Sequence, residues 1–419
     1  MPTIHASDQV NRRQALQQLA AGAVGAAGAC SAALGQDEQP AAAGKGGKTG
    51  GVFVERQGNG AEIWQVTTEE RPHSNIYCEV PYCSEDSRHL VYERRGEDRD
   101  NRTDFVAVEL GTWQERVLDS SLGMAGCAIT PDGMFYYLER SGETQQLLRA
   151  KLPDGKPEPV HQFAEAPWTW SFGTVSPDHR YYVRGKRLDD KWKLFGILLV
   201  DLQTGEETLI DQDPYTFNAH PQFDLGGGRQ VMVQHNRGGG FDSQGQNYRS
   251  TGPEGATLYV VSVPDGKRTE LQVGKPYTSP VTGHEAWIGQ TGEMLLSVSA
   301  SGDYAPEQGN LLGVRPGAAA RVVAKGYKFN HVGVSRCGRL FSADDYQGTF
   351  KVVIGSTQTG KSAVVCESLT QPTNAQNTHA HPYLTPDLKW VVFNSNRSGF
   401  PHVYAARVPE GRVDELLRS

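Results

Sequence analysis

Short apolar runs separated by polar turns recur along most of this chain, and several of them are copies of one pattern. The stretch TPDLKWVVFNSNRSG has clear relatives in SEDSRHLVYERRG, TPDGMFYYLERSG and SPDHRYYVRGKR. Weaker relatives are DLGGGRQVMVQHNRG, GQTGEMLLSVSASG and SRCGRLFSADDYQG. The seven copies start at Ser84, Thr130, Ser176, Asp224, Gly289, Ser335 and Thr385. Their spacing is 46 to 50 residues, except for one interval of 65 (289 minus 224) that contains the insertion GGGFDSQGQNYRSTGPEG.

Each copy predicts the same succession of four strands. An apolar strand is followed by a Pro-Asp or Gly turn, a second apolar strand, a polar loop and a third strand such as DFVAVEL or ATLYVVSV. A fourth strand follows a Gly-containing turn, as in QTGEETLI. Four strands in about 40 to 50 residues is the period of a propeller blade, whose faces are buried against its neighbours. We therefore predict an all-β fold, a seven-bladed β-propeller of four-stranded blades over residues 52–419.

Two further features refine this architecture. The stretch AEIWQVTTE, from Ala61, precedes the first copy, and we expect it to add a strand to the last blade and close the ring. The insertion in the fourth blade, residues 236–254, is expected to lie over a mouth of the central channel. The alternative is an array of separate β-sandwich domains, and it is disfavoured because no linker-like stretch interrupts the seven units.

Composition agrees with this fold class and narrows the range of partners. The 419 residues include 48 glycines and 23 prolines, as expected for a chain with many turns. The formal net charge of -7 gives no reason to expect nucleic-acid binding. No apolar run reaches the roughly 18 to 20 residues of a membrane-spanning helix, so we expect no transmembrane helix. The five cysteines beyond Cys30 lack the tight spacing of a disulfide scaffold, although Cys78 and Cys83 could either pair or remain buried thiols.

Residues 1–34 have the pattern of an export signal. Arg12 and Arg13 precede a short Ala/Gly/Leu segment, which resembles a bacterial Tat signal. The sequence AGAC, ending at Cys30, also resembles a weak lipoprotein box, with cleavage without a lipid as the alternative. Residues 35–51 are rich in Gly and Ala and are predicted to be a flexible linker. We expect a protein exported through Tat, periplasmic or lipid-anchored at Cys30.

Histidines occupy nearly equivalent places on the predicted innermost strands, which line the channel of a propeller. In each copy the position equivalent to Pro386 of the last copy serves as the reference. Counted within its own copy, the histidine lies five residues before this position for His220, His331 and His381, and six residues before it for His284. His379 is a fifth histidine in the same region. A stacked core histidine is the alternative for any one of them. Five that converge on one axis predict a ligand.

Three of these histidines come from neighbouring blades and predict a metal site. His379 and His381 are two residues apart, so on a β-strand they would share one face about 7 Å apart. His331 of the sixth blade can meet them, and Gln376 adds a carbonyl oxygen. Three imidazoles and an amide oxygen suit a divalent transition-metal ion, because this donor set is intermediate between the sets that Zn and Mn prefer. The absence of carboxylates from this set argues against calcium and magnesium.

Arginines recur where the second strand of a blade ends, and we expect them to ring one mouth of the channel. Because a guanidinium binds a carboxylate through two parallel hydrogen bonds, such a ring indicates a small anionic ligand. The alternative is a set of unrelated surface arginines. The residues are Arg94 with Arg95, Arg140, Arg184, Arg237 and Arg397. Of these, Arg94, Arg140, Arg184 and Arg397, together with His220, are interpreted as substrate-binding.

Three stretches of the chain resemble those of a known family. QNTHAHPYLTPDLKWVVFNSN, FNHVGVSRCG and GHEAWIGQTGE look like the three signature stretches of oligogalacturonate lyases, the propellers of polysaccharide lyase family 22. The resemblance covers about residues 60–410. It implies a manganese ion, with another divalent transition metal as the alternative, held by His331, Gln376, His379 and His381. It also implies His284 as the general base.

One stretch departs from the family's pattern. Where the family has Cys-His-Glu, this chain has Gln234, His235 and Asn236. His235 ends the second strand of the fourth blade beside Arg237, and these two form the rival catalytic pair to His284. The departure bears on the identity of the substrate.

These observations together predict a metal-dependent polysaccharide lyase that acts on short uronic-acid oligosaccharides such as oligogalacturonates. β-Elimination removes the proton at C5 of the uronide and expels the glycosidic oxygen at C4, and a metal on the adjacent carboxylate neutralises the developing charge. A neutral imidazole, with a pKa of about 6.5, can take that proton.

Two other classes of propeller are alternatives to the lyase. The first is a non-catalytic periplasmic propeller of the Tol type that binds a glycan or a protein partner. The histidine and glutamine set discriminates, because a binding propeller has no need for it. The second is a peptidase propeller, which would require an α/β-hydrolase domain with a Gly-x-Ser-x-Gly elbow, and no such domain fits this chain.

Overall fold

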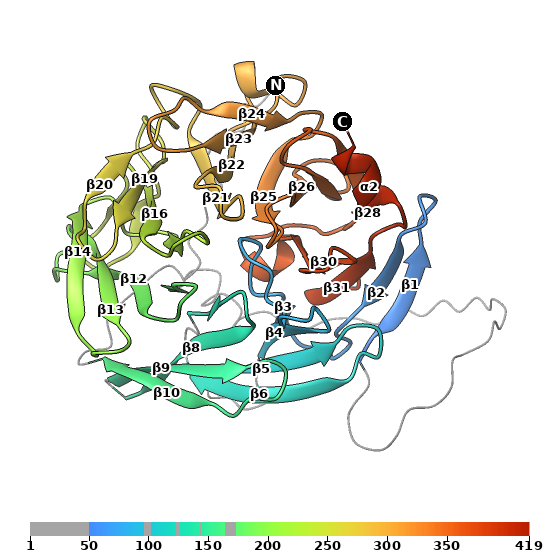
Figure 1. Cartoon of the computed structure of the whole chain (residues 1–419), viewed down its shortest axis with the longest axis horizontal. Helices are drawn as coiled ribbons and strands as arrows, with labels where there is room; N and C mark the ends of the chain where they lie inside the picture. The colour runs from blue at the N-terminus through green and yellow to red at the C-terminus, as the bar shows by residue number, and fades with distance from the viewer. Residues whose placement is uncertain (1–49, 96–101, 123–125, 143, 164–172, 419) are drawn as a thin grey trace.

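The computed structural model describes residues 50–95, 102–122, 126–142, 144–163 and 173–418. Seven sheets stand around one axis like the blades of a propeller, which confirms the predicted fold class (Figure 1). The expected export signal and nearly all of the expected linker lie outside the described residues.

Each of the first three blades contains four antiparallel strands, which follow one another from the axis outward. Blade 1 contains β3 (His73–Ser74), β4 (His89–Arg95), β5 (Arg102–Glu109) and β6 (Glu115–Leu122). Blade 2 contains β7 (Ala128–Ile129), β8 (Met134–Ser141), β9 (Thr144–Lys151) and β10 (Glu158–Phe163). Blade 3 contains β11 (Thr174–Val175), β12 (Tyr181–Arg187), β13 (Phe195–Asp201) and β14 (Glu207–Asp213).

The next three blades repeat this plan, and blade 4 carries the insertion as an extra hairpin. Blade 4 contains β15 (Gln222–Phe223), β16 (Gln230–His235), β19 (Thr257–Ser262) and β20 (Arg268–Glu270), and its hairpin is β17 (Gly240–Phe241) with β18 (Asn247–Arg249). Blade 5 contains β21 (Val281–Trp287), β22 (Met294–Val298), β23 (Leu311–Val314) and β24 (Arg321–Ala324), with the short 3₁₀ helix η1 (Gly302–Tyr304). Blade 6 contains β25 (Phe329–Val334), β26 (Leu340–Asp345), β27 (Lys351–Ser356) and β28 (Ser362–Glu367), and the 3₁₀ helix η2 (Gln376–Thr378) follows it.

Blade 7 joins the two ends of the described chain. It contains β29 (Tyr383–Leu384), β30 (Trp390–Ser395) and β31 (His402–Arg407), followed by β2 (Glu62–Gln65) and β1 (Val52–Arg56). β2 pairs antiparallel with β31, with Glu62 opposite Arg407 and Gln65 opposite Tyr404. The expected ring closure is therefore confirmed, and it adds two N-terminal strands to the blade. Helix α2 (Arg412–Leu417) ends the described chain.

The recurring Ser/Thr-x-Asp sequence forms the turn between the first and second strands. In four blades the hydroxyl of the Ser or Thr donates a hydrogen bond to the carboxylate two residues later, so the polar side chains close the turn themselves. The pairs are Ser84 with Asp86 (2.6 Å), Thr130 with Asp132 (2.6 Å), Ser176 with Asp178 (2.5 Å) and Thr385 with Asp387 (2.7 Å). The repeated motif is thus a local folding signal that places the end of each innermost strand.

The apolar core lies between neighbouring sheets. One cluster, for example, joins Leu138 and Phe163 of blade 2 to Tyr182 and Val200 of blade 3, and all four are buried. Each sheet is apolar on both faces, so a single blade cannot bury its own faces. Each face is buried only when a neighbouring blade of the ring packs against it.

The hairpin of the insertion is anchored to blade 3. The ring of Phe241 lies 5.5 Å from Trp192, 5.4 Å from Phe195 and 4.9 Å from Phe217. Its expected position over a mouth of the channel stays a prediction.

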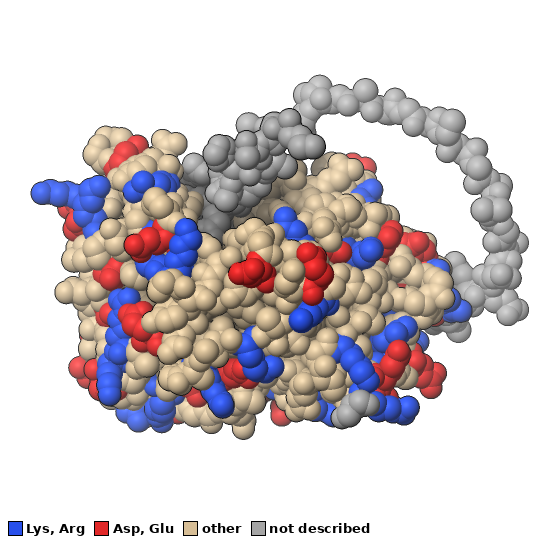
Figure 2. All heavy atoms as spheres, turned by 90° about the horizontal axis from the view of Figure 1, so that it is seen from above, with Lys and Arg blue, Asp and Glu red and all other residues tan. Residues whose placement is uncertain are grey.

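The surface carries both signs of charge. On the face that Figure 2 presents, Lys and Arg are interspersed with Asp and Glu. In the part of the chain that the structure describes, no helix has the length and apolarity needed to cross a membrane. Cys78 and Cys83, the candidate disulfide pair, are instead two buried thiols.

Polar contacts hold blade 7 against blade 1. His73 stacks on His402 with ring centroids 5.3 Å apart, and Thr67 Oγ1 lies 3.1 Å from His402 Nδ1. The side chain of Asn75 donates to the carbonyl of His381 at 2.8 Å. Burial, reinforced by the neighbouring His402, lowers the pKa of His73 to about 3.

We expect this seam to lose stability in mild acid. The unfolded chain binds a proton at His73 near pH 6.5, whereas the folded chain resists it down to about pH 3, so stability is full above pH 6.5 and falls as the pH drops below it. Between pH 7 and pH 5 this one group costs about 2 kcal/mol. Denaturant unfolding measures the free energy of unfolding at both pH values. Between pH 7 and pH 5 the His73→Phe variant should lose about 2 kcal/mol less of this free energy than the unchanged protein does. An unchanged loss would show that His73 is not the group responsible.

Candidate functional site

Three imidazoles meet at the axis, as the spacing of the histidines predicts. The ligand nitrogens of His331, His379 and His381 all lie within 4.8 Å of one another, and the three side chains are buried. The ring of His331 is 5.1 Å from that of His379 and 4.4 Å from that of His381, centroid to centroid. The group spans blades 6 and 7, so these side chains form a candidate metal centre.

His379 and His381 do not lie on a β-strand, and that expectation was wrong. His379 follows the turn of η2, and β29 begins only at Tyr383, after Pro382. Pro382 has no N–H for a strand ladder, and His381 before it has a φ of 43°, in the left-handed region that non-glycine residues rarely adopt. Gln376 opens η2 and is half-buried. Its role as a ligand stays a prediction.

Hydrogen bonds fix which nitrogens face one another. His379 Nε2 lies 2.8 Å from the carbonyl of Thr373, which can only accept, so Nε2 carries the proton and Nδ1 the lone pair. His331 Nδ1 lies 2.6 Å from Asp344 Oδ2. When Asp344 is ionised, His331 donates to it from Nδ1 and has its lone pair on Nε2. Metal-binding histidines use their second nitrogen in this way.

The two nitrogens with lone pairs are close enough to share an ion. His331 Nε2 and His379 Nδ1 are 3.2 Å apart, and two ligands about 2.1 Å from a tetrahedral ion are about 3.4 Å apart. Such a contact requires a proton or a cation between the lone pairs. Burial, together with the nearby His379, lowers the pKa of His331 well below its usual value and keeps the imidazole neutral. Burial raises the pKa of Asp344 to about 7. The residues therefore fit a divalent metal ion.

His284 stands beside this group and is the accessible member. Its ring lies 4.3 Å from that of His331, and its side chain is half-buried. Along β21, Val281 pairs with Val298 but Glu285 pairs with Leu296, so a bulge with extra residues turns His284 toward the axis. Gly283, at a φ of 90°, permits this turn.

Tyr77 of blade 1 completes the group and could not be found from the histidine pattern. Its hydroxyl lies 2.8 Å from His284 Nδ1, and its ring is 4.5 Å from that of His381. The pattern consisted of histidines on innermost strands, and blade 1 has none at the equivalent place. Asp344 was missed for a related reason. The signal was a pair of acidic residues, Asp344 and Asp345, at the end of the buried strand β26.

Carboxylates are closer to the histidines than expected. Asp344 contacts His331 directly. His220 Nδ1 lies 3.0 Å from Glu79 Oε1 and 3.8 Å from Glu285 Oε1, and these three side chains form a second group of ligand atoms within 4.8 Å of one another. The histidine group itself contains no carboxylate, as expected, but carboxylates lie beside it and in this second group.

The rival pair His235 and Arg237 lies in other surroundings. His235 Nε2 is 2.8 Å from Asp213, and its Nδ1 is 3.4 Å from Arg268, on the outer strands of blades 3 and 4. Arg237 donates to three backbone carbonyls, those of Gly255, Lys275 and Glu254. The described contacts do not bring this pair to His284.

Gln234 and Asn236, which depart from the family pattern, contact each other. Gln234 Nε2 donates to Asn236 Oδ1 at 2.6 Å.

The expected ring of guanidiniums at the mouth is not what the described contacts show. The guanidinium groups of these arginines bind partners within their own blade or on an adjacent blade. An equivalent place along a strand does not fix the direction of a long side chain. Burial lowers the pKa of Arg184 to about 10. Arg94 contacts Asp104, Glu69 and Glu115; Arg140 contacts Gly142; Arg184 contacts Gln145 and stacks over Phe163; Arg397 contacts Ser368, Glu367 and Glu55.

Comparisons with known proteins support the same architecture. No protein-family model and no curated protein matches this chain. An oligogalacturonate lyase in complex with manganese is similar to it, with a TM-score of 0.66 and 18% identity over 87% of this chain and 98% of that one. For the oligogalacturonate lyase of Vibrio parahaemolyticus the TM-score is 0.65 and the identity 17%, over 86% and 97% of the two chains. An uncharacterized protein from Listeria monocytogenes has a TM-score of 0.50 and 13% identity, over 78% and 90%. At these identities the likeness shows that the chain has the fold of the two lyases over nearly their full length.

We expect Asp344→Asn to weaken metal binding at the histidine group. An amide that donates to His331 Nδ1 would move the imidazole proton to Nε2, the atom that faces His379, and loss of such a partner typically lowers metal affinity by about 10- to 100-fold. Titration of the metal-free protein with Mn²⁺ measures this affinity. The neighbouring Asp345→Asn is the matched control, and equal affinities for both variants and the unchanged protein would contradict the assigned tautomer.

Proposed function

We propose that this protein is a metal-dependent lyase that cleaves short uronic-acid oligosaccharides, such as oligogalacturonates, by β-elimination. The observation that carries the proposal is the convergence of three buried imidazoles with a fourth, accessible one, His284, at the axis. A propeller that only binds a partner has no need for this arrangement. The fold is shared with an oligogalacturonate lyase that was solved with manganese.

In this proposal the metal ion is Mn²⁺, held by His331, His379 and His381, with Gln376 as the fourth ligand. When bound, the ion would neutralise the carboxylate beside the C5 proton and so favour the negative charge that develops there. The three imidazoles are buried and come from two blades, so the protein holds them in place before any ion or substrate binds.

His284 is the proposed general base. The tautomer that donates from Nδ1 to the hydroxyl oxygen of Tyr77 has its lone pair on Nε2, which would take the C5 proton. As that proton leaves, the C4–C5 double bond forms and the C4–O bond breaks. The departing oxygen takes a proton from water and becomes the hydroxyl of the second product, and His284 returns its proton to the solvent. Tyr77 keeps the ring of His284 in one orientation throughout.

The arginines are not part of this proposal, because their guanidiniums already bind protein groups. We further propose that the protein is exported through Tat to the periplasm or the cell envelope, on the evidence of Arg12 and Arg13.

Two substitutions separate a metal ligand from a base. His379→Ala removes a ligand, so bound metal and activity should fall together. His284→Ala should keep the metal while the rate falls by a factor of about 10² to 10⁴, the usual loss for a general base. Elemental analysis measures the metal, and the ultraviolet absorbance of unsaturated uronides measures elimination on a panel of galacturonate and glucuronate oligomers.

His161→Ala on the outermost strand of blade 2 is the control, which should keep both metal and activity. If His284→Ala loses the metal, His284 is a ligand and the base lies elsewhere. If the unchanged protein forms no unsaturated product from any oligomer of the panel, the lyase proposal is wrong and a binding propeller is the better account.

A further inference from the structure

A second set of ligating side chains lies in the channel, apart from the three histidines. His220 Nδ1 lies 3.0 Å from an oxygen of Glu79 and 3.8 Å from an oxygen of Glu285. The side chain of Glu285 is fully buried, His220 is buried, and Glu79 is half-buried. The three come from different blades, since Glu79 belongs to blade 1, His220 precedes β15 of blade 4, and Glu285 lies on β21 of blade 5. The proposed lyase uses none of them as a metal ligand.

Blade 4 presents His220 through the same local structure that presents His381. Both histidines lie in an Ala-His-Pro sequence, and their φ angles are 44° and 43°. In both, the carbonyl of the alanine accepts a hydrogen bond from the second strand, at 2.7 Å from Gln234 N and at 2.8 Å from Asn394 N. The left-handed conformation is strained for histidine and persists only where the surroundings impose it. The same Ala-His-Pro conformation thus places His220 in blade 4 and His381 in blade 7.

Charge favours a cation at this second set. With His220 protonated, the two carboxylates and the imidazolium carry a net charge of -1. With a neutral imidazole and a divalent ion, the same group has a net charge of zero. Since a charge in the interior is stable only when it is compensated, the second state suits the buried position better. One imidazole and two carboxylates are also a harder donor set than three imidazoles and suit Mn²⁺.

The side chain of Tyr77 lies near both sets. The ring of Tyr77 lies 6.2 Å from that of His220 on one side and 4.5 Å from that of His381 on the other. Tyr77 is thus close to both sets, and the two sets share no donor.

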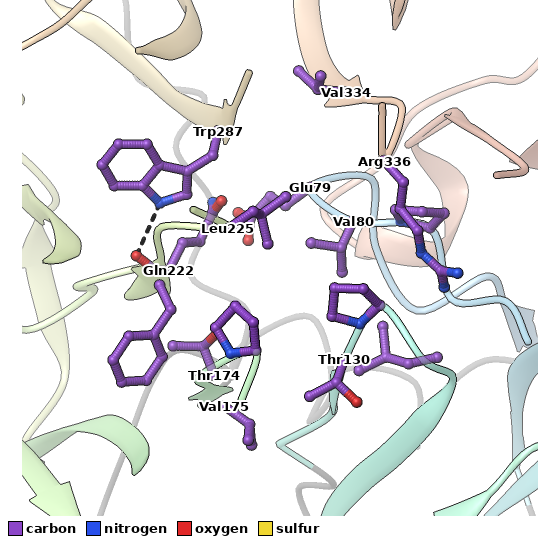
Figure 3. Close-up of a pocket in the computed structure, with 15 residues that line it drawn as sticks. Glu79, Val80, Thr130, Thr174, Val175, Gln222, Leu225, Trp287, Val334 and Arg336 are labelled. Atoms are coloured by element: carbon purple, nitrogen blue, oxygen red, sulfur yellow. Dashed lines mark hydrogen bonds between the residues drawn. The ribbon is translucent and has the colours of Figure 1, made fainter. Parts of the chain in front are cut away.

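One member of the second set, Glu79, lines a pocket. Glu79 lines this pocket together with Gln222, Trp287 and Arg336, which lie beyond the histidines along their strands. Figure 3 shows Glu79 between Leu225 and Gln222 on one side and Val80 and Arg336 on the other. Trp287 Nε1 donates to the carbonyl of Gln222 at 3.1 Å and holds the wall in place. The pocket lining includes Glu79 and none of the three clustered histidines.

We propose that Glu79, His220 and Glu285 form a second divalent-cation site, distinct from the histidine group. It joins blade 1 to blades 4 and 5, which lie across the axis from it.

Counting bound ions tests this proposal without any assay of activity. The chelator-stripped protein is titrated with Mn²⁺, and binding is followed by loss of the electron paramagnetic resonance signal of the free ion. We expect two equivalents for the unchanged protein, one for Glu285→Gln, one for Glu79→Gln and one for His379→Ala. The double variant Glu285→Gln with His379→Ala should bind none. Glu410→Gln, an exposed carboxylate with the same charge change, should still bind two.

The outcomes separate this site from the lyase proposal. One equivalent in the unchanged protein, lost in His379→Ala but kept in both glutamate variants, would overturn the second site and leave the lyase intact. One equivalent that is lost only in the glutamate variants would support the second site and remove the metal from the histidine group. Circular dichroism checks folding, and if Glu285→Gln fails to fold, the half-buried Glu79→Gln decides the result.

Discussion

The pairing of β2 with β31 is the constraint on which the rest of this structure depends. It joins the N-terminal strands to the last blade, and only a closed ring places blade 1 beside blade 7. Across that seam Asn75 holds the carbonyl of His381, and its backbone N–H donates to the side chain of Asn394 at 2.8 Å. Tyr77 follows two residues later and reaches His284 on blade 5. The axial group is therefore assembled from segments about 300 residues apart, and no part of the chain could build it alone.

Departures from regular β structure place each functional histidine. His284 and His331 lie in bulges of β21 and β25, where the paired strands run out of step. His220 and His381 lie before their strands in the left-handed conformation. Bulges and strained residues are common beside functional sites, because they turn a side chain out of the regular alternation. The innermost strands of blades 2 and 3 carry no histidine and contribute to the wall of the pocket instead.

The seven blades and the convergence of the histidines could be predicted from the sequence, because both follow from a repeat of about 46 residues. A repeat fixes how far along a strand a residue lies. It does not fix which face a long side chain takes, and so Arg184 packs over Phe163 between two blades instead of joining a ring at the mouth. Nor does it reveal partners that lack a histidine, such as Tyr77 and Asp344. The strand expected at His379 failed because Pro382 delays the start of β29.

Our central claim is that the histidine group binds a metal ion. Anomalous X-ray diffraction from crystals grown with Mn²⁺, measured on both sides of the manganese absorption edge, tests it most directly. We expect a strong anomalous peak between His331 Nε2, His379 Nδ1 and the ring of His381. A map with no peak there, or with manganese only at the protein surface, would contradict the claim.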